Sequence, residues 1–404
     1  DGSRPFLRQG TARREGIRAG LGQHGFDFAK QTPSALQIAG ILGILLLNIY
    51  SFSRPADYSH SLLWTEAGYS ALDEALYGIQ TLFFTGRFLT IFNVLFGVSL
   101  LLIADKYGAA YLQRRLWWLA AFGLLHGALV WEGDILLWYA LSALVVLKQG
   151  YLSLDSAQLW RKGMLFFVIG LLFPAAISGL VFLDAEPLYL LTAEDLDAER
   201  LQWSGSYLDR ILLMAESNAV MLFGFVLSMF WSTAGLMLLG AALYRQHWFA
   251  TGYSVARSLL LFVAALTISS ITLYLDHATG YQYELAPFLP WELVAALLMA
   301  LAYASLLIRF CNTAKIGAWL APCGRMAFTL YLTQSFVMVW LFRIAKPDWF
   351  ASLDRLSTLA IALLAIAIQL LVCRFYLQYF SQGPFEWLWR RLSGKPQVSV
   401  DQNP

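Results

Sequence analysis

The residues best suited to chemistry lie in one stretch, which runs from Arg114 to Leu147. His126 stands inside an apolar run, and Asp134 follows eight positions later, after a short polar turn. An ionisable group is costly in a membrane, so it usually faces the interior of a helix bundle or a wet cavity. A neutral imidazole can act as a general base near pH 7. The pattern predicts a proton-transfer site with His126 and Asp134 as its catalytic residues.

Both residues also have a purely structural interpretation. His126 would then only hydrogen-bond a neighbouring helix, and Asp134 would only cap the N-terminus of the helix that follows it. In the functional interpretation, Asp134 orients His126 or binds a polar acceptor. The spacing alone leaves these interpretations open.

A second set of polar and aromatic residues is predicted to bind substrate. Arg87 has a guanidinium group that suits a phosphate or a carboxylate, although it could also reach toward lipid headgroups. A glutamine in the middle of an apolar span needs a partner, so Gln334 is expected to face the bundle interior. Taken singly, each such residue is equally explained by a hydrogen bond between helices. The full set is Arg87, Asn93, Asn48, Trp131, Glu132, Gln334 and Ser335.

The elements that must position these residues are membrane helices. The chain has 404 residues, of which 59% are hydrophobic and only 13% charged, and its mean hydropathy is +0.59. A soluble protein carries about 25% charged residues. Long apolar runs near the length that a bilayer requires predict an all-α, polytopic membrane bundle. About ten spans are expected, at 34–52, 87–104, 115–131, 134–150, 163–183, 218–243, 256–275, 291–310, 319–342 and 357–379.

The distribution of basic residues predicts how the bundle is oriented. With these spans, 20 of the 28 Lys and Arg residues fall on one side and 6 on the other. Lys and Arg favour cytoplasmic loops, so both termini are expected in the cytoplasm. Residues 1–33 and 394–404 would be cytoplasmic tails around one transmembrane domain, 34–393. That domain divides into a motif-bearing half (34–183), an acidic external loop (184–216) and a C-terminal half (217–393). A mixed segment at 72–85 is expected at the interface.

Several functional classes lack their usual signals. The three cysteines have no spacing typical of a zinc site or a disulfide framework, so no metal is expected. Phosphate-loop, HExxH and GxSxG motifs are absent, and no nucleic-acid partner is predicted. Acidic residues are almost missing from the spans, which counts against an ion-coupled pump.

The stretch around His126 resembles the YeiB-like family of bacterial inner-membrane proteins, long classed as a domain of unknown function. Its hallmark, RRL…GLxHxxLxWxGDIL…YAL, is matched from Arg114 to Leu141. Three further stretches are similar to family elements: 86–97, 324–335 and 383–390. The first span departs from the family pattern, with Ser34, Gln37 and Ile38 in place of an aspartate, an arginine and a glycine.

The family is distantly similar to transmembrane acyltransferases, which use an intramembrane histidine. The resemblance implies that an acyl group moves from cytosolic acyl-CoA, with phosphates near Arg114 and Arg115, to an acceptor outside. His126 would deprotonate the acceptor or carry the acyl group transiently. It also implies a multi-pass protein of the bacterial inner membrane. Its partners would be membrane lipids, and the protein could form oligomers. Two alternatives stay open: a transporter of a small or lipidic solute, and a non-catalytic membrane partner.

Overall fold

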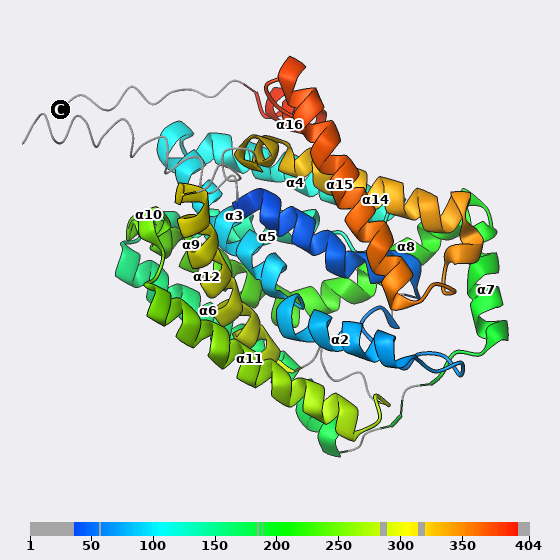
Figure 1. The fold of residues 1–404 in the computed structure, drawn as a ribbon. Coiled ribbons are helices and arrows are strands. Elements are labelled where there is room, and N and C mark those ends of the chain that lie inside the picture. Colours follow the sequence, from blue (N-terminus) through cyan, green and yellow to red (C-terminus); the bar gives the residue numbers. More distant parts are fainter. Residues whose placement is uncertain are drawn as a thin grey trace, which may run out of the picture.

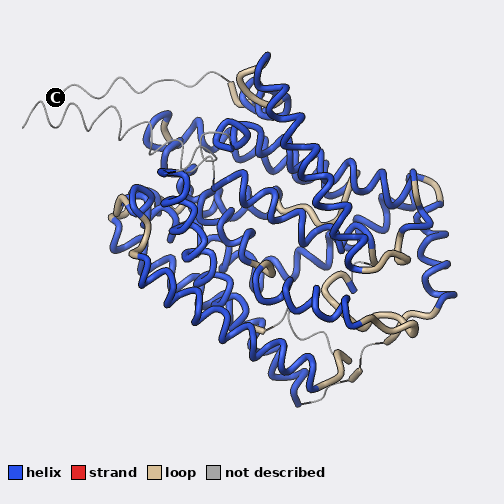
Figure 2. Tube along the Cα trace, in the orientation of Figure 1, coloured by secondary structure: helices blue, strands red, loops and turns tan. Residues whose placement is uncertain are grey.

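The computed structural model describes residues 36–55, 58–183, 186–187, 189–282, 289–313 and 320–394. The expected tail at 1–33 and all but the first residue of the expected tail at 394–404 lie outside these residues. Regular structure in the described ranges is helical, apart from one isolated bridge between Thr65 and Leu191. The prediction of an all-α membrane bundle is thereby confirmed (Figure 1, Figure 2).

The helices follow the apolar runs of the sequence. A first helix, Leu36–Ser53, precedes the labelled ones. Those are α2 (Ala71–Phe83), α3 (Arg87–Tyr107), α4 (Ala109–Leu129), α5 (Leu136–Lys148), α6 (Ser156–Leu183), α7 (Ala193–Ser204), α8 (Tyr207–Gly224), α9 (Phe230–Arg245), α10 (Trp248–Thr251), α11 (Val255–Ala278), α12 (Pro290–Thr313), α14 (Ala327–Trp340), α15 (Arg355–Tyr379) and α16 (Pro384–Leu392).

Eight helical segments of the described chain are long and apolar enough to cross a membrane. The expected pair at 115–131 and 134–150 corresponds to α4 and α5, and neither helix is among those eight. The 13 residues of α5 span about 20 Å, which is less than the hydrocarbon thickness of a bilayer. If α4 and α5 do not cross the membrane, the number of crossings falls by two. The C-terminus therefore stays on the predicted side.

The centre of the bundle depends on a close crossing of α3 and α9. A Cβ added to Gly97 would lie 1.9 Å from the carbonyl oxygen of Met237, and one added to Gly240 would lie 1.9 Å from that of Val94. Only glycine allows two backbones to approach so closely. Helix α6 packs along the other side of α9, and α11 pairs with α12 at the edge (Figure 1). Helix α3 is thereby fixed in the middle, where it faces both α4 and α12.

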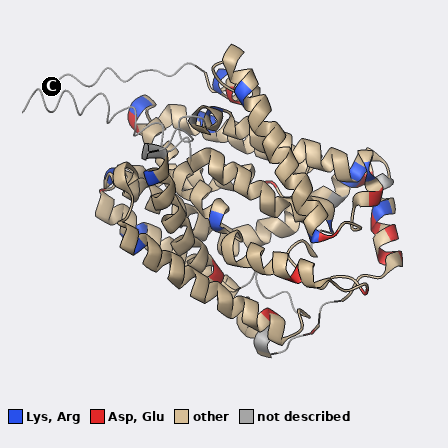
Figure 3. Cartoon of the chain, viewed as in Figure 1, with Lys and Arg blue, Asp and Glu red and all other residues tan. Residues whose placement is uncertain are grey.

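The connections gather at two ends of the bundle. At the α16 end, Arg114 donates to the carbonyl of Ser393 and Arg245 to that of Leu154. At the α7 end, Arg200 donates to the carbonyl of Phe350, and the N–H of Ala351 to Ser53. Lys and Arg predominate at the α16 end, whereas acidic side chains line α7 (Figure 3). Each contact joins connections that the charge pattern assigns to the same side of the membrane.

The acidic loop expected at 184–216 is shorter than predicted and partly helical. It contains α7, and α8 begins at Tyr207 rather than near 218. Ser206 starts α8 with a capping box, in which its hydroxyl accepts from the N–H of Asp209 and the Asp209 carboxylate accepts from Ser206. This local signal outweighs the charges that suggested a loop. A π turn at Phe225–Met229 joins α8 to α9.

Candidate active site

The stretch that carries His126 folds as a helical hairpin of α4 and α5. Helix α4 ends at Leu129, and the carbonyl of His126 accepts hydrogen bonds from the N–H groups of Val130 and Trp131. The Trp131 ring is buried against Phe52 of the first helix, with 4.3 Å between ring centroids. These contacts fix the turn and bring the chain back toward α4.

His126 and Asp134 meet across this turn. The Nδ1 atom of His126 lies 2.9 Å from Oδ1 of Asp134, and the two residues are only 3% and 1% exposed. The second carboxylate oxygen, Oδ2, accepts a hydrogen bond of 2.8 Å from the N–H of Leu137 in the first turn of α5. Asp134 therefore bonds the first turn of α5 and holds His126 at the same time, so the capping contact and the orienting contact that the sequence offered as alternatives are both present.

This arrangement defines which nitrogen of His126 is available. Because the Asp134 carboxylate is an acceptor, the neutral form of the imidazole carries its proton on Nδ1 and its lone pair on Nε2. Nε2 is buried and has no hydrogen-bond partner in the part of the chain that the structure describes. The imidazole ring lies beside Tyr331 of α14, at 5.5 Å, and Trp131, at 6.5 Å. A histidine in this state has the form that a general base requires.

The pair depends on a close approach of α5 to α4 at Gly123. A Cβ at this position would lie 2.2 Å from the backbone nitrogen of Leu137 and 2.8 Å from Oδ2 of Asp134. No flexible side chain can move aside, because the nearest atom belongs to the backbone. The glycine one turn before His126 therefore sets the distance between the helices that share the pair.

We expect Gly123→Ala to destabilise the protein by about 1–3 kcal/mol, the usual effect of overpacking a dense interior. The reason is that α5 must move away from α4, which also lengthens the His126–Asp134 contact. Thermal unfolding in detergent measures this loss. Gly179→Ala in α6 is the matched control, since an added Cβ there meets nothing within 4 Å. Equal stability of the two variants would contradict the close approach.

Asn218 of α8 is a neighbour of the pair that the sequence reasoning missed. Its Nδ2 donates to the carbonyl of Gly127 at 3.0 Å and to that of Met214 at 2.6 Å. Its Oδ1 would lie 3.2 Å from a Cβ on Gly127, which would also meet Asp134. Asn218 was assigned to the start of a span and received no role, because nothing local to it points toward α4.

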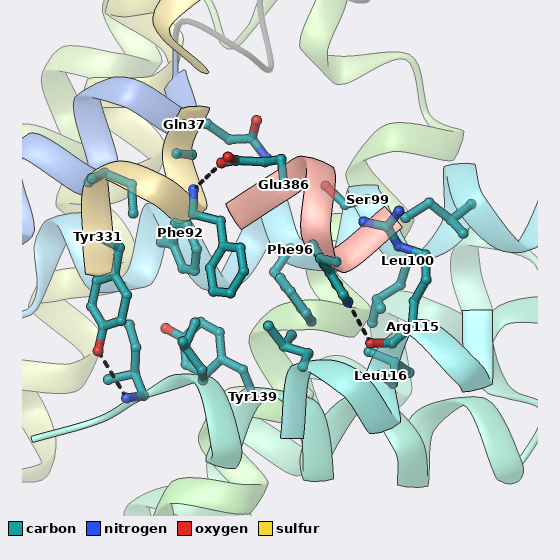
Figure 4. A pocket seen from close by; sticks show the side chains of 18 of the residues that line it. Gln37, Phe92, Phe96, Ser99, Leu100, Arg115, Leu116, Tyr139, Tyr331 and Glu386 are labelled. Carbon is teal, nitrogen blue, oxygen red and sulfur yellow. Dashed lines mark hydrogen bonds between the residues drawn. The ribbon is translucent and has the colours of Figure 1, made fainter. Parts of the chain in front are cut away.

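An elongated cavity of about 280 Å³ lies between α3, α4, α5, α14 and α16. Figure 4 shows Tyr331 at one end of it, Arg115 at the other, and Phe92 and Phe96 between them. Most of its surface is aromatic or aliphatic. The hydroxyl of Tyr139 lies in this lining, is buried, and has no hydrogen-bond partner among the described residues.

The cavity reaches the α16 end of the bundle, where its lining becomes polar. Arg115 places its guanidinium 3.8 Å from the ring centroid of Trp389, and the indole N–H donates to the carbonyl of Arg115 at 2.8 Å. Glu386 caps α14, because its Oε1 accepts from the N–H groups of Phe328 and Thr329. Arg390 completes this part of the lining. Glu386 and Trp389 belong to the C-terminal motif, to which no site role was assigned from sequence.

The inner end of the cavity adjoins the His126–Asp134 pair without including it. Tyr331 and Ile135 both line the cavity. The Tyr331 hydroxyl accepts from the N–H of Ile135 at 3.2 Å, while its ring lies against His126. Tyr331 therefore stands between the cavity and the imidazole.

Arg87 has a different environment from the one expected at an open substrate site. It is completely buried, and its Nη1 lies 3.2 Å from Oε2 of Glu292 on α12. It also donates to the hydroxyl of Ser269 and to the carbonyl of Thr85. Thr272 donates to the other oxygen of Glu292 at 2.5 Å. The guanidinium is thus held in a closed network between α3, α11 and α12.

The two residues of α14 that were predicted to bind substrate also have partners in the bundle. The side-chain amide of Gln334 donates to Gln369 of α15 at 2.9 Å. The Ser335 hydroxyl donates to the carbonyl of Tyr331 in its own helix at 3.5 Å. Arg114 holds the C-terminal end of α16 through Ser393, whereas its neighbour Arg115 lines the cavity. The cavity lining includes Arg115 but not Gln334, Ser335 or Arg114.

The remaining predicted residues lie on three different elements: α3, the first helix and the turn of the hairpin. Asn93 of α3 is buried, and its Oδ1 has no partner among the residues that the structure describes. Asn48 of the first helix is half-buried. Glu132 is half-buried in the turn, and burial raises the pKa of its carboxyl, partly offset by the charge of Arg343. The described residues contain no group of three side chains that could hold a metal ion.

Comparison with known proteins places the chain in a family. The family model described as "Protein of unknown function (DUF418)" matches residues 243–395. The chain is 30% identical over 363 residues to "Uncharacterized protein YeiB" of Escherichia coli (strain K12), covering 87% of this chain and 93% of that protein. It is 27% identical over 381 residues to "Uncharacterized protein YxaH" of Bacillus subtilis (strain 168), covering 87% and 90%. No solved structure matches it significantly. With 30% identity over nearly the whole length of YeiB, this membrane protein belongs to the YeiB-like DUF418 family.

Proposed function

We propose that this chain is a transmembrane acyltransferase of the bacterial inner membrane, which moves an acyl group from cytosolic acyl-CoA to an acceptor on the other side. The observation that carries the proposal is the buried His126–Asp134 pair, whose free Nε2 lies beside the inner end of the cavity. The α16 end would face the cytoplasm, in agreement with the excess of Lys and Arg there.

The chemistry follows from the state of the imidazole. Nε2 of His126 takes the proton of an acceptor hydroxyl or amine as that group attacks the thioester carbonyl. The C–S bond breaks and the acyl group passes to the acceptor oxygen or nitrogen. The imidazolium, held by the Asp134 carboxylate, then returns the proton to the CoA thiolate. Asp134 favours this cycle because it stabilises the charged form of His126 and fixes its tautomer.

The cavity has the features that an acyl-CoA donor needs. Arg115 and Arg390 at the α16 end offer positive charge for the phosphates of CoA. The aromatic and aliphatic walls beyond them suit the pantetheine arm and a short acyl chain. The volume of about 280 Å³ leaves the nucleotide outside the bundle. Tyr331 must turn aside for the thioester to reach Nε2, so substrate binding would open the inner end.

A thermal-shift titration with acetyl-CoA and longer acyl-CoAs tests whether the cavity is the donor site. We expect saturable stabilisation of about 2.7 kcal/mol at a hundredfold excess over the dissociation constant. Ser99→Phe should abolish this shift, because Ser99 lines the cavity and its hydroxyl bonds only to its own helix.

Thr267→Phe is the matched control for that variant. Its hydroxyl makes the same bond to its own helix, at 3.0 Å, but the residue lies on the exposed face of α11. Stabilisation by acyl-CoA that persists in Ser99→Phe would place the donor elsewhere. No shift with any acyl-CoA would contradict the donor assignment altogether.

A further inference from the structure

A second pocket, which is lined by several charged and polar side chains, lies at the α7 end, where the first helix, α2 and α15 meet. Its volume is about 410 Å³, and its lining includes Arg54, Trp64, Tyr69, Asp73 and Arg355. Arg54 follows the first helix, and Arg355 is the first residue of α15. Neither arginine belongs to the cavity beside His126.

The two arginines are deeply buried and close to each other. They are 3% and 1% exposed. Both guanidinium groups lie over the ring of Tyr50, at 5.1 Å for Arg54 and 4.9 Å for Arg355. Both also donate to the carbonyl oxygen of Ser61, at 3.4 Å and 2.7 Å respectively. One ring and one carbonyl thus bring two positive charges together.

Across the described ranges, no carboxylate lies at salt-bridge distance from either guanidinium group, so no ion pair within those ranges neutralises these charges. Arg355 donates to the neutral Gln80, and the carboxylate of Asp73 accepts from the backbone N–H of Arg355 and from Ser70. The other acids of the pocket, Glu66 and Asp354, are exposed at its rim.

This arrangement is costly unless an anion completes it. Arginine stays protonated in proteins, so the two guanidinium groups repel each other away from bulk water. Burial and the charge of Arg355 lower the pKa of Arg54 to about 9, which still leaves it charged at neutral pH. Removing one partner from a buried charge pair is strongly destabilising. Here the single carboxylate of Asp73 acts on both guanidinium groups without forming an ion pair with either, so the described residues balance the two positive charges only in part. Of the Arg54 guanidinium, only Nη1 makes a hydrogen bond within the described residues.

We propose that this pocket binds the phosphate group of a ligand at the α7 end, with Arg54 and Arg355 as the binding residues. A phosphate carries close to two negative charges at neutral pH and three strong acceptor oxygens. It can therefore face both guanidinium groups at once, in the bidentate geometry that arginine favours. A carboxylate offers one charge and two oxygens. The pocket stands apart from the His126 site, so this inference does not depend on the proposed function.

The first experiment is a thermal-shift titration of the full chain in neutral detergent. Inorganic phosphate is compared with sodium acetate at equal ionic strength. Mixed micelles of phosphatidic acid, whose headgroup is a phosphate monoester, are compared with diacylglycerol, which has no phosphate. We expect a saturable rise in melting temperature with phosphate or with phosphatidic acid, but not with acetate or diacylglycerol. A response to the lipid alone identifies a membrane phospholipid as the source, and a response to inorganic phosphate identifies a soluble one.

Arg54→Gln tests the assignment to this pocket. We expect it to weaken phosphate binding by about 10- to 100-fold, the range for hydrogen bonds to charged groups. Because the change removes a repelling charge, the ligand-free variant should be at least as stable as the wild type. Arg210→Gln is the matched control, since Arg210 lies at the same end but lines a different basic pocket with Arg200 and Arg343.

The results that would overturn the proposal are distinct. Phosphate binding that survives Arg54→Gln, or that is lost in Arg210→Gln instead, places the anion elsewhere. A shift with acetate as large as that with phosphate rejects the phosphate assignment, and the absence of any shift rejects the site. His126→Gln should leave phosphate binding unchanged. A failure of the acyltransferase proposal can therefore be distinguished from a failure of the phosphate-site proposal.

Discussion

His126→Gln is expected to abolish acyl transfer while leaving the protein folded. Loss of a positioned general base typically lowers a rate by about 10²–10⁴-fold. Glutamine is polar and can still hydrogen-bond Asp134, so the cap on α5 through Leu137 should persist. The measurement is the rate of label transfer from radioactive acetyl-CoA in membranes that contain the variant or the wild type. Thermal unfolding of both proteins shows whether the variant is folded.

Acyl-CoA binding separates this prediction from its alternatives. Because the donor cavity does not include His126, the variant should bind acyl-CoA with unchanged affinity. A His126→Gln protein that transfers acyl groups at the wild-type rate would contradict the proposed chemistry. Solute flux that does not require His126 would favour a transporter. If His126→Gln changed no measured property and neither protein moved a solute, a non-catalytic partner would be favoured.

Arg87→Met is expected to destabilise the protein by about 3–5 kcal/mol, the usual effect of leaving one charge of a buried pair alone. The change removes the guanidinium that faces Glu292 and leaves that carboxylate buried with only the hydroxyls of Ser269 and Thr272. The measurement is equilibrium or thermal unfolding in detergent. The effect should appear in stability and not in the rate of transfer per folded molecule.

A double variant provides the control for this ion pair. Arg87→Met combined with Glu292→Met removes both charges, so it should recover much of the stability that the single change loses. An additive loss in the double variant would show that the two charges do not interact. If Arg87→Met kept its stability but lost affinity for an acceptor, Arg87 would return to the substrate-binding role that the sequence suggested.

Local patterns were sufficient to predict much of the fold and the contact at the centre of the candidate site. The apolar runs located the helices, because a bilayer permits few other structures. The turn after Trp131 placed Asp134 close in sequence to His126, and a single hairpin brings such neighbours together. The structure adds that Asp134 uses both carboxylate oxygens, one for the imidazole and one for α5.

Contacts between distant helices could not be predicted in the same way. Glu292 is 205 positions from Arg87, and Asn218 is 91 positions from Gly127. No periodicity within one helix indicates which residue of another helix it will face. The two arginines of the α7-end pocket lie near the ends of spans 301 positions apart, and the sequence placed them only among external charges. Their shared contact with Tyr50 depends on how the first helix packs against α15.

The most direct test of the proposed transfer uses sealed, inverted inner-membrane vesicles from a bacterial host that expresses the chain, in which the cytoplasmic face points outward. Radioactive acetyl-CoA is added outside, and label in acceptor material on the luminal side is measured after the outer surface is treated with a hydrolase. Transfer across the bundle predicts protected label in vesicles that contain the wild-type chain and none in those with His126→Gln. Equal protected label in both would contradict the account, as would wild-type vesicles that bind acetyl-CoA but never protect its acetyl group.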